Sequence, residues 1–424
     1  MKKFTEVVAE LEALQMMPKT MPGLEKIKKA FKLTDWYDQI DPDKIIVVAG
    51  TNGKGTTCAA LEALLIEAKQ KVGFYSSPHL VSTTERIRLN GQDITEAEFL
   101  SLYDECLPLI ESCGLSHFEA LTLMAGFYFF SKRWNSNPDF VIFEVGLGGS
   151  FDAVNAFPHK YCAITKLGID HVNILGHGLV EIAQNKFGIV GTKNIVVHHK
   201  LPSELEELKK QTQKKTNSNW LEAEQYTVEI KKNSKVPSYF IKYGQLKLQI
   251  NLPGARAAEN IMTAVTLFRV LGFDSEHFLT ALNKISWSGR MQKIEWAGLN
   301  CPLYVSGDHN RQGVESLLEI LKDFAWHHLH LIVGIGIDKD AEQMLNAFSG
   351  LTNVKLYLTE TPFKGRSLSD YPEKFLALAE DRNASVIESL AAVTKRAQPE
   401  DLALVTGSLY LVGEVLKLTR KISS

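Results

Sequence analysis

Residues Val47 to Thr56 read Val-Val-Ala-Gly-Thr-Asn-Gly-Lys-Gly-Thr, so a β-branched run breaks into a glycine-rich turn that carries one lysine. The three glycines let the backbone bend until successive N–H groups point at anionic oxygens, and the start of a helix adds its positive end. A buried-looking strand (Ile45 to Ala49) precedes the turn, and a helical apolar pattern (Thr57 to Ala68) follows it. This context favours a phosphate-binding loop over an ordinary glycine turn.

The spacing of this loop differs from that of the common P-loop, which places its hydroxyl residue directly after the lysine. Here Gly55 stands between Lys54 and Thr56. The loop is therefore a variant of a nucleotide phosphate site, in which Lys54 supplies a positive charge. The residues that we expect to contact ATP are Gly50, Thr51, Asn52, Gly53, Lys54, Gly55 and Thr56.

Composition bounds the kind of protein to which the loop belongs. A chain of 424 residues is too long for one hydrophobic core and predicts two domains. The formal net charge of −2 gives no basic excess that would favour nucleic acid. Five cysteines without a Cys-x-x-Cys pair predict neither disulfides nor zinc, and we expect them in the core. With no signal peptide and no bilayer-spanning stretch, we expect a cytoplasmic protein without nucleic-acid or membrane partners.

Strand and helix patterns alternate along the chain, which favours a mostly parallel, P-loop-type sheet with helices on both faces. The expected strands are Ile45 to Ala49, Val72 to Ser76, Phe140 to Val145, Tyr161 to Thr165 and Asn194 to His198, and the expected helices are Glu96 to Leu109, Phe118 to Trp134, Val180 to Ile189 and Ser203 to Lys215. Short alternating segments between Tyr226 and Ile250 predict a small antiparallel meander, and a helix from Ala257 to Leu271 follows it.

A second alternation of strands and helices begins after the segment Ile294 to Pro302. Its expected strands are Leu303 to Val305, Leu329 to Val333, Val354 to Thr359 and Leu402 to Thr406. They indicate a smaller, Rossmann-like α/β domain. We therefore expect an α/β protein with an ATP-binding domain at residues 1–295 and a C-terminal ligand-binding domain at residues 296–424.

Polar residues follow several of the expected strands, at the edge where open parallel sheets bind ligands. Glu144 ends one strand, and Asp170 and His171 follow another. Because a hard cation beside ATP prefers carboxylate, hydroxyl and phosphate oxygens, Glu144 and Thr56 suit a magnesium site, with His171 as an additional ligand. The alternatives are an exposed strand-end carboxylate and a satisfied loop histidine. The polar loop from Val81 to Asp93 is either solvated surface or a substrate lid.

Sequence blocks that belong together are spread along nearly the whole chain. They are Ala49-Gly-Thr-Asn-Gly-Lys-Gly-Thr56, Ser76-Ser-Pro-His-Leu80, Glu85-Arg-Ile87 with Asn90-Gly91, His117-Phe-Glu-Ala120, Glu144-Val-Gly-Leu-Gly-Gly149, Gly168-Ile-Asp-His171, Trp287-Ser-Gly-Arg290 and Val405-Thr-Gly-Ser-Leu-Tyr-Leu-Val-Gly-Glu-Val415. Together these blocks resemble the dihydrofolate synthase/folylpolyglutamate synthase branch of the Mur ligases. Several of them are specific to that family, so the resemblance is stronger than a phosphate-loop match.

The resemblance implies an ADP-forming amide ligase that uses ATP and Mg²⁺, with up to two metal sites. It also implies that residues 1–295 form the ATP-binding, Mur-ligase-like central domain and that residues 296–424 form the glutamate-binding ligase domain. A pterin-bearing carboxylate takes the γ-phosphoryl group of ATP, and the amine of L-glutamate then displaces phosphate from the acyl phosphate. By similarity Lys54, His171 and Lys186 are catalytic, and Ser77, Glu144 and His171 are metal ligands. Lys186 matches a lysine that is often carbamylated in the family and then helps to hold a second metal. An ordinary surface lysine is the alternative at this position.

The remaining site residues also follow from the resemblance. Asn260, Arg290 and Ser306 match positions that contact ATP. The positions implied for substrate binding are Gly23, Leu24, Glu25, Lys26, His117, Phe118, Glu119, Ala120, Ser150, Phe151, Asp152 and His309. The expected partners are therefore small molecules, namely ATP, a pterin or folate, and L-glutamate, and the family leads us to expect a monomer.

Three departures from the family pattern concern the acceptor and ATP positions. Ser150 stands where the family has an arginine, so a planar bidentate donor is missing. The family's Arg-His-Gln reads Ala255-Arg-Ala257, and its Asp-Gly-Ala-His-Asn-Pro reads Ser306-Gly-Asp-His-Asn-Arg311. The second of these blocks moves an acidic group from position 306 to Asp308.

These departures leave more than one function open. The chain is either a divergent folate enzyme, which adds the first glutamate, later ones or both, or a paralogue that joins an amino acid to another carboxylate. An inactive nucleotide-binding homologue is a third interpretation. A kinase-like phosphotransferase would share the loop, but it would leave a stable phosphorylated acceptor instead of releasing phosphate with amide formation.

Overall fold

The structure is a computed structural model that describes residues 2–14, 23–232, 236–273, 276–362 and 365–423. Contacts divide the chain into two compact units, and each unit is built from two segments. The first comprises Met1–Tyr226 and Glu259–Lys284, and the second comprises Thr227–Ala258 and Ile285–Ser424. The expected domain boundary at residues 295 and 296 stays a prediction. The meander that we placed before this boundary belongs by its contacts to the second unit.

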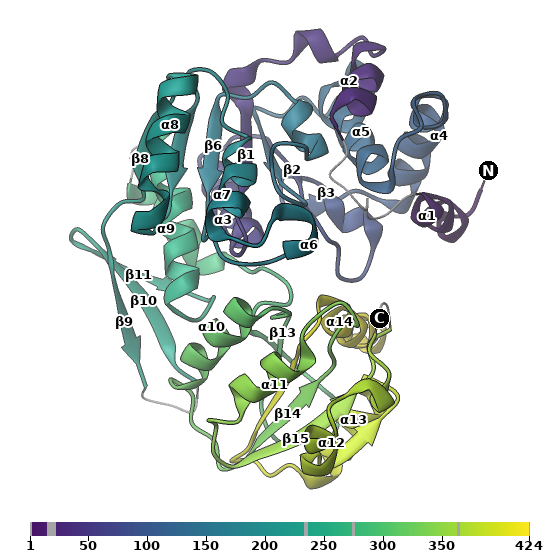
Figure 1. The fold of residues 1–424 in the computed structure, drawn as a ribbon, viewed down its shortest axis with the longest axis vertical. Coiled ribbons are helices and arrows are strands. Elements are labelled where there is room, and N and C mark those ends of the chain that lie inside the picture. Colours follow the sequence, from purple (N-terminus) through teal and green to yellow (C-terminus); the bar gives the residue numbers. More distant parts are fainter. Residues whose placement is uncertain (1, 15–22, 233–235, 274–275, 363–364, 424) are drawn as a thin grey trace. The chain divides into compact units, whose positions relative to one another are not determined.

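An eight-stranded, mostly parallel sheet forms the centre of the first unit (Figure 1). In order across the sheet, its strands are β4 (Gln92–Asp93), β3 (Ile87–Leu89), β2 (Val72–Tyr75), β5 (Phe140–Glu144), β1 (Ile45–Ala49), β6 (Tyr161–Ile164), β7 (Ile195–His198) and β8 (Asn219–Glu222). The six strands β2, β5, β1, β6, β7 and β8 pair in parallel with their neighbours. β3 and β4 add an antiparallel hairpin at one edge. The central strand β1 is apolar and buried throughout, as is typical of a strand covered on both faces.

Helices cover both faces of this sheet. Ile45, Val47 and Ala49 of β1 share one core with residues of α1 (Phe4–Ala13), α2 (Glu25–Lys32), α4 (Glu96–Cys113) and α5 (His117–Phe130). Helix α3 (Lys54–Glu67) packs on β1, β2 and β5, and its buried leucines lie outside that core. The other helices of this unit are α6 (Val172–Leu175), α7 (Leu179–Phe187), α8 (Glu206–Thr216) and the greater part of α9 (Ala255–Val270). Short 3₁₀ helices are η1 (Tyr37–Gln39), η2 (Pro42–Lys44), η3 (Thr83–Arg86), η4 (Lys132–Trp134), η5 (Ala153–Ala156), η6 (Ser203–Leu205) and η7 (Glu276–Lys284).

The second unit contains two sheets. The antiparallel meander is formed by β9 (Thr227–Lys231), β10 (Ser238–Tyr243) and β11 (Leu246–Ile250). The larger sheet has the order β12 (Gln292–Ile294), β13 (Leu303–Ser306), β17 (Leu402–Thr406), β14 (Leu329–Val333), β15 (Val354–Thr359) and β16 (Asp381–Asn383). Only β12 pairs antiparallel among these described strands. Its helices are α10 (Arg311–Leu321), α11 (Ala341–Phe348), α12 (Glu373–Leu378), α13 (Val386–Arg396) and α14 (Leu409–Ser423), with η8 at Leu368–Asp370.

The predicted fold class is confirmed, and the differences lie at the sheet edges. The edge strands β3, β4, β8, β12 and β16 were not predicted. The segment from Val81 to Asp93 is not a plain solvated loop, because it contains η3 and the hairpin, and Arg86 within it is buried. All five cysteines are free and buried, as expected. Among the described residues, no helix combines the length and apolar character needed to cross a membrane.

Candidate active site

The glycine-rich loop joins β1 to α3 at the carboxyl end of the central strand. Gly53 is the N-cap of α3 and has a φ of 92°, in the left-handed region that favours glycine. The loop is held against the segment after β6, because the Thr51 N–H donates to the Lys166 carbonyl (2.9 Å) and Thr165 Oγ1 donates to the Asn52 carbonyl (2.8 Å). The N-terminus of α3, where helical N–H groups lack intrahelical acceptors, is thus fixed at the edge of the sheet where ligands bind.

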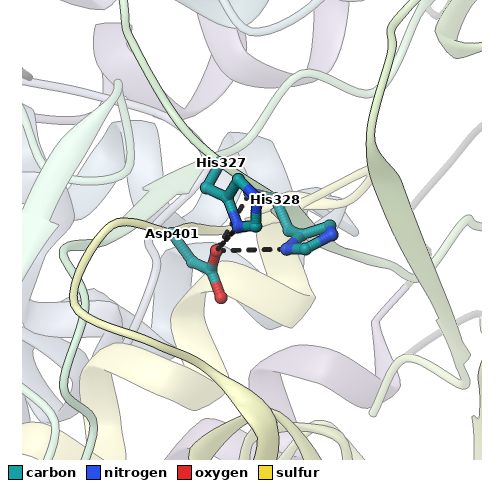
Figure 2. Close-up of side chains that lie close together, drawn as sticks. All are labelled: His327, His328 and Asp401. Atoms are coloured by element: carbon teal, nitrogen blue, oxygen red, sulfur yellow. Dashed lines mark hydrogen bonds and ion pairs between the residues drawn. The ribbon is translucent and has the colours of Figure 1, made fainter.

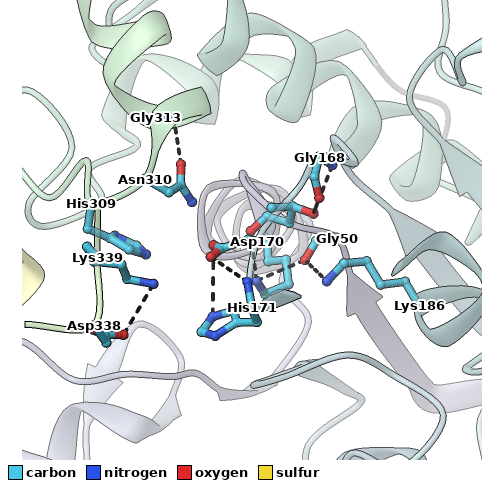
Figure 3. A network of polar contacts seen from close by, with 12 residues as sticks. Gly50, Gly168, Asp170, His171, Lys186, His309, Asn310, Gly313, Asp338 and Lys339 are labelled. Carbon is cyan, nitrogen blue, oxygen red and sulfur yellow. Dashed lines mark hydrogen bonds and ion pairs between the residues drawn. The ribbon is translucent and has the colours of Figure 1, made fainter. Parts of the chain in front are cut away.

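Two lysines meet at one carbonyl oxygen of this loop. Lys54 Nζ donates to the carbonyls of Gly50 (3.2 Å) and Thr51 (3.4 Å). Lys186, from α7, donates to the same Gly50 oxygen at 3.0 Å (Figure 3). The two lysine side chains that the resemblance implies are catalytic therefore share an acceptor within the glycine-rich loop.

Lys186 lies in an environment that disfavours its positive charge. Its side chain is buried, which rules out the surface-lysine alternative. Burial, and next the charge of Lys54, lower the pKa of Lys186 to about 7, although Asp170 and Asp152 act in the opposite direction. A substantial fraction of Lys186 is therefore a neutral amine, and hence nucleophilic, near neutral pH.

A buried hydroxyl and a buried carboxylate lie together where β2 and β5 end. The Ser77 N–H donates to Glu144 Oε2 at 3.2 Å, and the buried Ser77 Oγ has no hydrogen-bond partner among the residues that the structure describes. Glu144 is 5% exposed, so the alternative of an exposed strand-end carboxylate is wrong. An orphaned hydroxyl oxygen beside a carboxylate is a donor set that a hard divalent cation takes, so these residues fit Mg²⁺.

His171 is held by the residue before it. It is the N-cap of α6, its N–H donates to Asp170 Oδ1 (2.8 Å), and its Nε2 lies 4.0 Å from Asp170 Oδ2 (Figure 3). The imidazole is 32% exposed, so it keeps access to a ligand. This arrangement is typical of a histidine that a neighbouring carboxylate orients.

The loop after β5 is organised around Asp152. One of its oxygens accepts the N–H groups of Gly146 (3.0 Å) and Leu147 (2.9 Å), and the other accepts that of Val154 (3.1 Å). Burial raises the pKa of Asp152 to about 6, against the opposing effect of these hydrogen bonds. Asp152 therefore shapes this loop, whatever it contacts when substrate is bound.

Ser150 does not take over the work of the missing arginine. Its Oγ donates to the Asn185 carbonyl (3.0 Å), so the hydroxyl is used to join the loop to α7. The neighbouring Phe151 has a 46% exposed side chain. A short hydroxyl in this place offers no planar, long-reaching donor to an acceptor.

The other residues implied for acceptor binding open two helices. Gly23 and Leu24 precede α2, which begins with Glu25, and Lys26 Nζ donates to the Gly114 carbonyl (2.9 Å). Within α5, which also carries Phe118 and Ala120, Glu119 and Ser116 form a capping box. His117 is buried with Nδ1 2.9 Å from the Leu11 carbonyl, and its Nε2 finds no hydrogen-bond partner within the described part of the chain. Burial, and next the charge of Arg86, lower the pKa of His117.

Asn260 contributes to the phosphate loop from α9. The backbone carbonyl of Asn260 accepts a hydrogen bond from Thr57 Oγ1 at 3.2 Å. A Cβ added to Gly53 would lie 2.1 Å from Asn260 Oδ1, so this side chain presses directly on the loop. The structure thus brings Asn260 against the glycine-rich loop although the two segments are far apart in the sequence, and its contact with ATP stays a prediction.

In the second unit, Ser306 ends β13 and is tied to the displaced acidic residue. Ser306 Oγ donates to Asp308 Oδ2 at 2.7 Å and accepts the Met291 N–H at 3.2 Å. Two residues further on, Asn310 caps α10 through the Gly313 N–H (2.8 Å; Figure 3). Asp308 therefore places a carboxylate next to the position where the family has its aspartate, and close to the positive end of a helix.

Arg290 and His309 converge on a single carbonyl of the second unit. Arg290 Nη1 donates to the Gly307 oxygen at 3.3 Å, and His309 Nδ1 lies 2.9 Å from the same atom. These two predicted ligand contacts therefore meet at one turn, between β13 and α10, although Arg290 itself precedes β12. Their roles toward ATP and glutamate stay predictions.

Comparison with known proteins identifies the family. The sequence profile described as "Mur ligase middle domain" matches residues 48–268, and that described as "Mur ligase, glutamate ligase domain" matches residues 289–409. A protein of Buchnera aphidicola subsp. Schizaphis graminum named "Dihydrofolate synthase/folylpolyglutamate synthase" is 30% identical over 388 residues, covering 88% of this chain and 87% of the relative. The chain belongs to this branch of the Mur ligases.

Other relatives of this Mur ligase agree. The Bacillus subtilis protein of the same name is 29% identical over 400 residues, covering 87% of this chain and 89% of the relative. The ligase spans only 48% of a Haloferax volcanii protein named "Probable bifunctional folylpolyglutamate synthase/dihydropteroate synthase", to which it is 28% identical.

Solved structures extend the agreement to the fold. Escherichia coli FolC in complex with DHPP and ADP has a TM-score of 0.82 at 25% identity, with 100% and 99% of the two chains covered. A bifunctional folylpolyglutamate synthase/dihydrofolate synthase with Mn, AMPPNP and L-glutamate bound has a TM-score of 0.81 at 27% identity, with 99% and 98% covered.

Sequence reasoning on this Mur ligase gave no role to Arg86, which was treated as part of a charged loop. Arg86 is 7% exposed, and its Nε donates to His79 Nδ1 at 3.0 Å. The positive charge of Arg86 also acts to lower the pKa of Tyr75 and of His117. Burial, and next the charge of Arg86, lower the pKa of His79 to about 3. A buried guanidinium among the residues implied for acceptor binding is a candidate anion ligand. The available signal was its place in the block Glu85-Arg-Ile87.

Proposed function

We propose that this protein is an ATP-dependent, ADP-forming ligase that joins L-glutamate to the carboxylate of a pterin acceptor. The observation that carries the proposal is the glycine-rich loop at the start of α3, where Lys54 and Lys186 share the Gly50 carbonyl. The names of the relatives support the substrate class, and the ADP, AMPPNP and L-glutamate of the solved relatives support the co-substrates.

The first step is transfer of the γ-phosphoryl group to the acceptor. An acceptor carboxylate oxygen attacks the γ-phosphorus, the bond to the bridging oxygen breaks, and ADP leaves with the electron pair. Lys54 and the N–H groups at the start of α3 stabilise the phosphate charge. Ser77, Glu144 and the partly exposed His171 would hold Mg²⁺, which when bound neutralises charge on the transferring group. Asn260 stabilises the loop through its contacts with Gly53 and Thr57.

Amide formation follows. The amine of glutamate attacks the acyl carbon, phosphate leaves with the electrons of its bond to carbon, and a proton is released. We place glutamate and part of ATP with the residues of the second unit, Arg290, Ser306 and His309, and we take Asp308 as the compensating carboxylate for the family's aspartate. Residues 1–295 and 296–424 are proposed as the two functional domains, and a monomer is proposed as the active form.

Lys186 is proposed to be carbamylated. A neutral lysine amine attacks CO₂, forms an N–C bond and loses a proton, which converts a base into an anion. The lowered pKa and the buried position of Lys186 support this step, because an ammonium group cannot attack CO₂. The product would be a carboxylate beside the phosphate loop that suits a second divalent cation.

One observation favours a second candidate, which is the same chemistry on a different carboxylate. Ser150 uses its hydroxyl on the Asn185 carbonyl, so the acceptor loses the donor that the family's arginine supplies. If the acceptor is a pterin, we propose that Arg86, which is also a guanidinium, supplies the missing positive charge.

The test is phosphate release by the purified protein with ATP, Mg²⁺ and L-glutamate, with dihydropteroate, tetrahydrofolate or no acceptor, and products weighed by mass spectrometry. A gain of one glutamyl unit on either pterin is the expected result, and it tells which of the two activities the ligase has. ATP binding without turnover on either pterin would favour another acceptor. A phosphorylated product that accumulates would refute the ligase.

A further inference from the structure

Two histidines and an aspartate gather at the amino ends of two neighbouring strands in the second unit. His327 and His328 immediately precede β14, and Asp401 immediately precedes β17. These strands pair in parallel with Leu329 opposite Leu402, so the residues before them are neighbours. Ser306 and the turn after it lie at the carboxyl ends of the same sheet, so the cluster is separate from the proposed ligand residues of this unit.

The donor atoms of the cluster converge (Figure 2). His328 Nδ1 lies 3.4 Å from Asp401 Oδ1, His327 Nδ1 lies 3.9 Å from the same oxygen, and one donor atom from each residue lies within 4.8 Å of the others. In a tetrahedral site with metal–ligand bonds near 2.0–2.1 Å, neighbouring donors are roughly 3.3 Å apart. Small rotations of the histidine side chains therefore suffice to place three donors around one ion.

The carboxylate of the cluster is already held in position. Asp401 is fully buried, Oδ1 accepts the His328 N–H (2.9 Å), and Oδ2 accepts the Gln398 N–H (2.9 Å). His330 Nε2 lies 3.1 Å from Oδ2, and its other ring nitrogen lies 3.1 Å from the Tyr357 hydroxyl.

Exposure differs along the cluster in the way that an accessible metal site requires. His327 is 68% exposed and His328 is 33% exposed, while the carboxylate is buried. An ion would therefore reach the imidazoles from solvent and keep a position open to water. An ion pair between Asp401 and protonated histidines is the alternative use of the same contacts.

We propose that His327, His328 and Asp401 bind a divalent transition-metal ion of the Zn²⁺ class, which clamps the entrances of β14 and β17. Two imidazole nitrogens with one carboxylate suit Zn²⁺, Co²⁺ or Ni²⁺, whereas Mg²⁺ prefers oxygen ligands alone. His330 and the backbone around Asp401 orient the carboxylate in the manner of outer-shell partners. The ion stabilises this unit and takes no part in the proposed ligase reaction.

The experiment is a calorimetric titration of Zn²⁺ into the chelator-stripped full chain in excess Mg²⁺, so that hard-cation positions are filled. The variant His327→Ala/His328→Ala is compared with His177→Ala, which removes an exposed histidine outside the cluster. We expect one zinc equivalent to be lost, or weakened more than about 100-fold, in the double variant only, since loss of an outer-shell partner alone costs 10–100-fold. Zn²⁺ should raise the Tm of the wild type and of His177→Ala by several degrees more than that of the double variant.

Co²⁺ provides a second readout, because its visible absorption reports coordination by nitrogen and oxygen donors. The wild type should show the bands of a low-coordinate site, and the double variant should lack them. Equal zinc stoichiometry and affinity in the double variant and the wild type would overturn the proposal. Retained acceptor-dependent phosphate release and circular dichroism in the double variant separate loss of the site from loss of the fold.

Discussion

Replacing Lys186 by methionine removes a titration that opposes folding. The pKa of Lys186 is lowered from 10.5 to about 7 by burial. Between these values the unfolded chain binds the proton and the folded chain does not, so this lysine makes the free energy of unfolding rise with pH. At pH 7 and below, the destabilisation of the folded state by Lys186 is close to its maximum. This destabilisation decreases progressively as the pH rises toward 10.5.

The size of the effect follows from the two pKa values. Linkage predicts that Lys186 alone raises the stability of the wild type by about 2 kcal/mol between pH 7 and pH 9. Methionine has a similar volume and no charge, so Lys186→Met should lack this rise. Loss of the hydrogen bond to the Gly50 carbonyl lowers the free energy of unfolding equally at pH 7 and pH 9. The difference between the two pH values is therefore unaffected.

The assay is urea unfolding followed by circular dichroism at pH 7 and pH 9, in buffers freed of CO₂ so that no carbamate forms. Lys28→Met, at an exposed lysine of α2, is the control and should keep the pH dependence of the wild type. A pH dependence of Lys186→Met within about 0.5 kcal/mol of the wild type would refute the reasoning. Addition of bicarbonate should then stabilise the wild type but not the methionine variant, and a stabilisation of both would count against carbamylation.

Three further changes probe the loop and the second unit. Lys54→Met should lower acceptor-dependent phosphate release by at least about 100-fold, because it removes the positive charge that stabilises the transferring phosphate. A fall of less than about tenfold would contradict that role. Gly53→Ala should destabilise the fold by more than about 1 kcal/mol and weaken binding of a non-hydrolysable ATP analogue, because φ is 92° and the new Cβ would meet Asn260; an unchanged melting temperature would show that the loop adapts. Ser306→Ala should cost about 1–3 kcal/mol in urea unfolding, because it leaves Asp308 and a buried N–H without their partner, and a loss below about 0.5 kcal/mol would mean that water replaces the hydroxyl.

Much of the fold was predictable because the central strands carry their own signal. β1 is a run of apolar residues that is followed by a glycine, and burial on both faces is typical of such a run. The missed edge strands are short and polar, so their pattern carries little information. One signal was available: Asn90 and Gly91 both have positive φ, 52° and 78°, and Asn-Gly is typical of a two-residue hairpin turn, which joins β3 to β4.

The candidate site was less predictable, since its contacts join distant segments. The phosphate loop is local and was found from its glycines. The bond of Lys186 to the Gly50 carbonyl spans 136 positions, and the environment that lowers the pKa of Lys186 exists only once α7 packs against the loop. For the same reason the partnership of Ser77 with Glu144, 67 positions apart, was implied only by resemblance. Arg86 was misjudged because charge in a sequence does not report burial.

The contact between Lys54 and its own loop bears on how the protein tells nucleotides apart. The ammonium group donates to the carbonyls of Gly50 and Thr51. Phosphate oxygens at that position would be charged acceptors, which bind an ammonium group more strongly than neutral carbonyls do. Adenosine would leave the lysine where it is and gain nothing from it. At this lysine, a preference for a nucleotide over a nucleoside therefore requires no contact with the base.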